Sequence, residues 1–254
     1  MTPLRHTAHL AIRLAAASLV AAALLLAWLA RAEPADAGVR AVRQQRALAL
    51  GIVVLATFAT PWAFAVIAAE SPGRRAVGWA YTTALPLPLV LFALAMGLGR
   101  VGEAPAIHAG QATALVFAYG VLGCAATDVC RLASPALGPL LPMCAGALLC
   151  LSPFIAGPWV EHAPDQARRE VRIAWVVAVN PLLASTATLP DYDPLRAEHV
   201  YERTPIGAYF VYRLSDPWRV VAAYLALAGA LGASAAVARR WSLGRSRIAS
   251  PRDA

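Results

Sequence analysis

Seven long apolar runs, rich in Ala, Leu and Val, constrain what this chain can fold into. They occupy residues 14–30, 47–69, 77–99, 110–129, 133–157, 173–189 and 220–238. A helix needs about 20 residues to cross the hydrocarbon core of a bilayer, and most of these runs reach that length. Backbone groups in lipid must pair internally, and runs without alternating polarity do so as helices. We therefore predict an all-α, polytopic transmembrane helix bundle that forms one domain over residues 1–254.

The charge content agrees with a chain that lies mostly in lipid. Only 14% of its residues are charged, whereas soluble domains carry about 25%. All 22 basic residues are Arg, since no Lys occurs, and all of them lie outside the seven runs. Basic residues at the ends of spans mark the cytoplasmic side and meet anionic lipid. We interpret the basic surplus as a topology signal and expect no nucleic-acid partner.

The distribution of Arg also predicts an orientation in a cell (inner) membrane. The side that bears the C-terminus collects more Arg than the other side, and the tail 239–254 is the densest cluster. The positive-inside rule places this tail in the cytoplasm, and seven spans then place the N-terminus and the connection 190–218 outside. The first run partly resembles a signal peptide, but cleavage would leave an Arg-rich loop outside, so we favour an uncleaved helix. If it is not a span, six helices remain with both termini inside.

Several classes of activity lack the residues they need. A Walker A loop requires Lys, so the chain is not itself a P-loop ATPase. The five His residues lie at ends or in connections, which argues against a haem held between spans. Ser234 has no later His to activate it, and no Cys or His spacing matches a zinc motif. We expect no cofactor, no metal and no catalytic residue from these patterns.

Asp128 is the one acidic residue within a predicted span. A carboxylate in lipid is costly, which makes it a candidate for a substrate path. Arg131 follows one turn later and could pair with it; alternatively, both residues lie at the interface where the fourth helix ends.

Four cysteines are symmetric about Leu137, so that a hairpin turning there would place them in pairs at similar depth: Cys124, Cys130, Cys144 and Cys150. We expect these cysteines to be small packing residues.

The segment 179–218 differs from the rest of the chain because it is polar, aromatic and rich in proline. Asn180-Pro181 is expected to end or kink the sixth run, and Asp193-Pro194 to start a short helix. The aromatic residues favour a lid lying flat on the outer surface; the alternative is a gate or a docking surface for a partner subunit. The candidate path or gate residues are Asp128, Arg131, Asn180, Pro181, Asp191, Asp193, Glu198, Tyr201, Glu202 and Arg203.

Asn180-Pro181, the polar segment 191–218 and the final apolar run together resemble the second half of ABC-2-type permeases. These are six-helix export permeases in which an Asn-Pro often sits near the last two helices, followed by a polar extracellular segment. The resemblance implies a transport subunit with a separately encoded ATPase as partner, and no catalytic residues carry over. The chain departs from the family in its seventh apolar run and in lacking a clear cytoplasmic coupling helix.

Two other functions stay open at this point. The chain could be a non-catalytic membrane scaffold or accessory subunit, and its oligomeric state is not readable. It could also be a membrane-embedded enzyme acting on lipid or a lipid-linked substrate, for which Asp128, Asp191 and Asp193 are the candidate carboxylates.

Overall fold

The structure is a computed structural model that describes residues 51, 53–54, 56–58, 60–61, 64–65, 109–134, 137–189 and 213–248. All secondary structure in this part of the chain is helical, as predicted. The complete elements are α5 (Ala109–Ala133), α6 (Leu137–Ile155), α7 (Gly157–Glu161), α8 (Gln166–Val179), α9 (Pro181–Thr186) and α12 (Pro217–Ile248). The described positions between 51 and 65 are also helical, whereas the predicted runs 14–30 and 77–99 lie outside the described residues.

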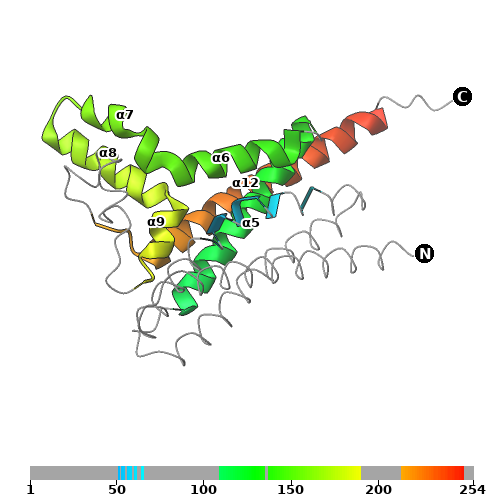
Figure 1. Cartoon of the computed structure of the whole chain (residues 1–254). Coiled ribbons are helices and arrows are strands. Elements are labelled where there is room, and N and C mark those ends of the chain that lie inside the picture. Colours follow the sequence, from blue (N-terminus) through cyan, green and yellow to red (C-terminus); the bar gives the residue numbers. More distant parts are fainter. Residues whose placement is uncertain are drawn as a thin grey trace, which may run out of the picture.

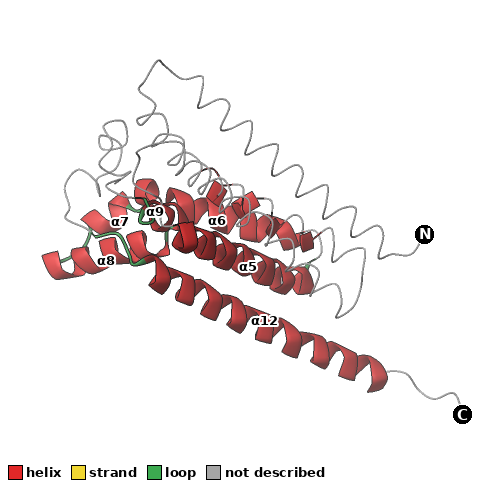
Figure 2. Cartoon of the chain, turned by 90° about the horizontal axis from the view of Figure 1, so that it is seen from below, coloured by secondary structure: helices red, strands yellow, loops and turns green. Residues whose placement is uncertain are grey.

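Three helices are long and apolar enough to cross a membrane. They are Gly110–Ala133, Leu137–Ile155 and Pro217–Trp241, and they correspond to the fourth, fifth and seventh predicted spans. Figure 2 shows α5, α6 and α12 alongside one another, with α7, α8 and α9 gathered at one end. These helices indicate a membrane protein, and the total number of spans stays a prediction.

Two contacts between α5 and α12 establish that these helices are parallel. Tyr119 packs against Tyr224 with ring centroids 5.6 Å apart, and Asp128, further along α5, pairs with Arg239, further along α12. Because α6 follows α5 after a short turn and packs along it, α6 runs in the opposite direction. The end of α6 and the start of α12 therefore lie at the same end of the bundle (Figure 1).

The predicted sixth span, residues 173–189, does not form one continuous helix, and it is not among the candidate spans of the described residues. A single crossing between α6 and α12 would make α5 and α12 antiparallel, whereas they are parallel. The run is divided between α8 and α9, which meet at Asn180, and α9 has only 6 residues. The physical reason is that α8 begins among charged residues such as Arg168 and Arg169 and ends at an Asn-Pro pair. The apolar half of α8 and all of α9 thus form a broken element that enters the bundle from one end.

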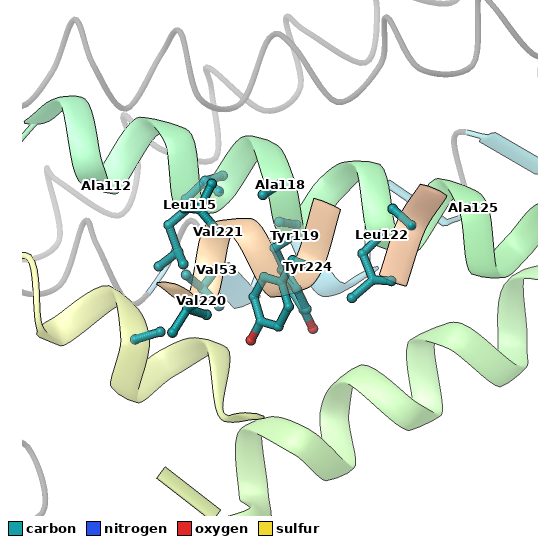
Figure 3. Close-up of a cluster of buried hydrophobic side chains, with 14 of the residues drawn as sticks. Val53, Ala112, Leu115, Ala118, Tyr119, Leu122, Ala125, Val220, Val221 and Tyr224 are labelled. Atoms are coloured by element: carbon teal, nitrogen blue, oxygen red, sulfur yellow. The ribbon is translucent and has the colours of Figure 1, made fainter. Parts of the chain in front are cut away.

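A core of small and branched apolar residues holds α5, α9 and α12 together. Its buried members include Ala112, Leu115, Ala118, Leu122, Ala125, Ala184, Leu189, Val220, Val221, Tyr224 and Ala228, many of which are seen in Figure 3. The buried residues of α5 recur every three or four positions, and the alanines among them let α12 approach closely. A second cluster joins α7, α8 and α9 through Val160, Ile173, Val176, Val177 and Leu183.

Candidate functional site

The break between α8 and α9 is built around Asn180, whose side chain is fully buried. Its Oδ1 accepts a hydrogen bond of 2.9 Å from the Leu183 backbone N–H and so caps the N-terminus of α9. Pro181 occupies the first helical position, where its missing N–H costs nothing. The predicted break at Asn180-Pro181 is thereby confirmed, with Asn and Pro in the roles of cap and helix start.

The same side chain also bonds to α6. Its Nδ2 lies 2.8 Å from the carbonyl oxygen of Leu149, 3.0 Å from that of Cys150 and 3.1 Å from the Ser152 hydroxyl. Pro153 lies four residues after Leu149 within α6. Since Pro has no N–H, the Leu149 carbonyl has no helical donor, and Asn180 supplies one. One buried amide therefore satisfies the carbonyl that Pro153 leaves open on α6 and a free N–H in the first turn of α9.

Tyr224 of α12 bonds to the α8 side of the helix break. Its hydroxyl donates a hydrogen bond of 3.1 Å to the carbonyl oxygen of Val179, the last residue of α8. Its ring packs against Tyr119 of α5 at an interplanar angle of 42° (Figure 3). The end of α8 is thus tied through Tyr224 to both long parallel helices.

Tyr119 extends these contacts to the helical segment around residue 57. The Thr57 hydroxyl donates to the Val53 carbonyl at 2.9 Å, so its oxygen accepts from Tyr119 Oη at 3.1 Å. Cys150 Sγ lies 3.9 Å from the same oxygen. We refer to Thr57, Tyr119, Cys150, Asn180 and Tyr224 as the polar core. These residues carry no charge and bond mainly to one another and to backbone, an arrangement suited to holding a helix break rather than to transferring protons.

Helix α6 approaches this core closely at Gly146. A Cβ at that position would lie 2.7 Å from both Thr57 Cγ2 and Tyr119 Oη. Since real Cβ contacts are longer, only Gly allows α6 to pack here.

Asp128 lies away from the polar core, toward the far end of α5. Its carboxylate accepts hydrogen bonds from Arg239 Nη1 at 2.8 Å and Nη2 at 2.6 Å. The Asp128 side chain is 6% exposed and that of Arg239 36% exposed. The partner of Asp128 is therefore Arg239 and not Arg131, which was one of two interpretations of the sequence; the stem of Arg131 lies against Gly138 at the turn between α5 and α6. A partner on α12 can form a bidentate pair, and it joins two spans as well.

The structure brings only some of the predicted site residues together. Asn180 and Pro181 meet at the break, whereas Asp128 and Arg131 lie elsewhere. The remaining candidates lie outside the described residues: Asp191, Asp193, Glu198, Tyr201, Glu202 and Arg203.

Sequence reasoning missed Thr57, Tyr119, Tyr224 and Arg239. For Thr57, Tyr119 and Tyr224 the available signal was a hydroxyl group within an apolar run, because a hydroxyl is buried only when it is hydrogen-bonded. All four cysteines are free thiols, and Cys124 and Cys150 are buried. Among the residues that the structure describes, no three His, Cys, Asp or Glu side chains are grouped so that they could hold a metal.

Comparison of the chain with protein-family models, with curated proteins and with solved structures finds no match. The helix break at Asn180 is therefore the feature of the molecule that bears on its function.

Proposed function

We propose that this chain is a permease-like subunit of a transport complex in which a separate chain hydrolyses ATP. The observation that carries the proposal is the broken element α8–α9, which enters the bundle between α6 and α12 and is held there by Asn180. Transporters commonly use interrupted helices near their substrate path, with freed backbone groups satisfied by neighbouring helices.

The corrected topology supports the resemblance to ABC-2-type permeases. Without a crossing at 173–189, the predicted runs that can cross number six, and both ends of the chain then lie on one side. The presence of seven apolar runs, one more than six crossings need, was one of the two departures from that family, and the broken run 173–189 accounts for the extra one. The polar segment after Asn180-Pro181 stays between the last two spans, as the resemblance expects.

An ATPase partner is supported by what the chain lacks and by how α12 ends. The sequence contains no Lys, so a P-loop must come from another subunit. Helix α12 continues to Ile248, beyond its apolar part that ends near Trp241. This extension carries Arg245 and Arg247, and we propose that it lies in the cytoplasm and contacts the ATPase.

The enzyme alternative loses one of its carboxylates. Asp128 accepts two hydrogen bonds from Arg239 and is nearly buried, so its role is to join α5 to α12. The polar core offers no charged group within the described residues. Copurification and ATP hydrolysis distinguish a scaffold from a permease subunit.

The experiment is purification of the tagged chain from its native membrane in a mild detergent, followed by reconstitution into phospholipid vesicles. We expect a nucleotide-binding subunit in fixed ratio and ATP hydrolysis that depends on the chain. Asn180→Leu should keep the partner and lose the stimulated hydrolysis, whereas Gly229→Ala, on an open face of α12, should keep both. Purification without any nucleotide-binding subunit would contradict the proposal. A partner whose hydrolysis is unchanged by Asn180→Leu would favour the scaffold.

A further inference from the structure

Helix α8 has two apolar faces, although only one of them packs against protein. Ile173, Val176 and Val177 lie on the inner face and pack with Val160 and Leu183. The opposite face would be polar in a water-soluble protein, because it points away from the core. In α8 it contains Ala167, Val171, Ala174 and Trp175, all of which are exposed. The exposed fraction is 56% for Val171 and 62% for Trp175.

The surroundings of this face indicate what covers it. Helix α8 lies at the end of the bundle where α6 stops and α12 starts, and in Figure 1 it slopes across the direction of α12. The last turns of α6, a candidate span, carry exposed Leu151, Phe154 and Ile155. The chain passes from these residues into α7 and then into α8, so the exposed apolar face of α8 lies close in sequence to the end of that candidate span.

Tryptophan and arginine are arranged as at a membrane interface. Trp159 on α7, Trp175 on α8 and Trp218 at the start of α12 are all exposed at this end. Trp prefers the headgroup level of a bilayer, where its ring and its N–H are both satisfied. The Arg172 guanidinium lies 5.1 Å from the centre of the Trp159 ring and donates to the Trp159 carbonyl, which joins α7 to α8. Arg168 and Glu170 are exposed beside the apolar face and suit the aqueous side of the interface.

We infer that α8 is an interfacial helix whose face Ala167, Val171, Ala174 and Trp175 contacts the phospholipid bilayer. This face is flanked by charged residues, which matches a helix lying along the membrane surface rather than one that spans it. Since α8 leads directly to Asn180, the contact holds the start of the helix break at a fixed depth. The inference is independent of the proposed transport function, because it concerns only where α8 lies.

The test places one spin label at a time on α8 in a variant without the native cysteines. Val171→Cys and Ala174→Cys report the apolar face, and Glu170→Cys on the same helix is the matched control. Each purified variant is reconstituted into phosphatidylcholine–phosphatidylglycerol vesicles, and its accessibility to oxygen and to a water-soluble nickel chelate is measured. At positions 171 and 174 we expect oxygen accessibility to exceed chelate accessibility several-fold, with the reverse at 170.

Two results would overturn the inference. Chelate accessibility at 171 and 174 equal to that at 170 would place the face in water. Low accessibility to both reagents, with dipolar broadening between labels, would show that a second copy of the chain covers it. Two labelled positions on the face protect the test against a single variant that fails to fold.

Discussion

Arg239 of α12 donates two hydrogen bonds to the carboxylate of Asp128 on α5, although 111 positions of sequence separate them. Together with the contact between Tyr119 and Tyr224, this pair establishes the parallel arrangement of the two helices. The parallel arrangement places the end of α6 and the start of α12 at the same end of the bundle, and we propose that α8–α9 enters and leaves the bundle on that side.

Removing either member of the ion pair should destabilise the protein, but unequally. Arg239→Leu leaves the nearly buried Asp128 carboxylate without its partner, and we expect a loss of about 3 kcal/mol or more in the free energy of unfolding. Asp128→Asn leaves Arg239, which is partly exposed and can still reach water, so the loss should be smaller. Thermal unfolding in detergent measures both. Asp128→Asn combined with Arg239→Leu should lose less than the sum of the two single variants, and simple additivity would contradict the pairing.

The bond between Asn180 and Leu149 is tested by restoring the donor that Pro153 lacks. Asn180→Ala leaves the Leu149 carbonyl unpaired, at a cost of about 1–3 kcal/mol. With Pro153→Ala in the same chain, α6 regains its own N–H and the carbonyl is satisfied again. We therefore expect the double variant to be less destabilised than the sum, with a coupling of about 0.5–3 kcal/mol. The control is Ser152→Ala, which removes one bond to Asn180 and leaves the carbonyl bonds in place.

Gly146 and Gly229 form a matched pair for close packing of helices. Gly146→Ala would place a Cβ 2.7 Å from Thr57 and Tyr119, and overpacking of this kind costs about 1–3 kcal/mol. Gly229→Ala meets nothing within 4 Å and should be neutral or stabilise α12 by up to about 1 kcal/mol. Melting temperatures of the two variants should shift in opposite directions or by clearly different amounts. Equal shifts would contradict the close approach of α6 to the polar core.

Tyr224→Phe separates the hydroxyl from the ring. The ring contact with Tyr119 is kept, but the Val179 carbonyl loses its donor, so we expect a loss of about 1 kcal/mol in unfolding free energy. Tyr224→Leu removes the ring contact as well and should cost more. A Phe variant as unstable as the Leu variant would show that the hydroxyl, and not the ring, holds α12 to the end of α8.

Much of the fold could be predicted from apolar runs, because the need to pair backbone groups in lipid leaves helices as the only solution for them. The break at Asn180-Pro181 was predictable for a similar reason, since Pro cannot continue a helix. The direction in which α8 and α9 run was not predictable, because a hydropathy window over 173–189 records only that the residues are apolar. The charged first turns of α8 were the local sign that the run starts outside the bundle.

The site itself was less predictable than the fold. Asn180 could be identified as a cap, but its bonds to Leu149 and Cys150 depend on how α6 packs. Arg131 was considered as a partner of Asp128 because it is one turn away, whereas the actual partner lies on another helix. Sequence spacing predicts contacts only between residues of one helix. The contact of Asp128 with Arg239 depends on how α5 and α12 pack against each other, which spacing does not record.

The most direct test of the account is the side of the membrane on which the two ends of the segment 156–216 lie. Single cysteines at Pro164, between α7 and α8, and at Arg213, before α12, are both at exposed positions. They are introduced into a variant without native cysteines and treated with an impermeant maleimide on intact cells. The account predicts that both are labelled from the same side, with Arg240→Cys at the other end of α12 labelled from the opposite side. Labelling of positions 164 and 213 from opposite sides would contradict it, because the chain would then cross the membrane between α6 and α12.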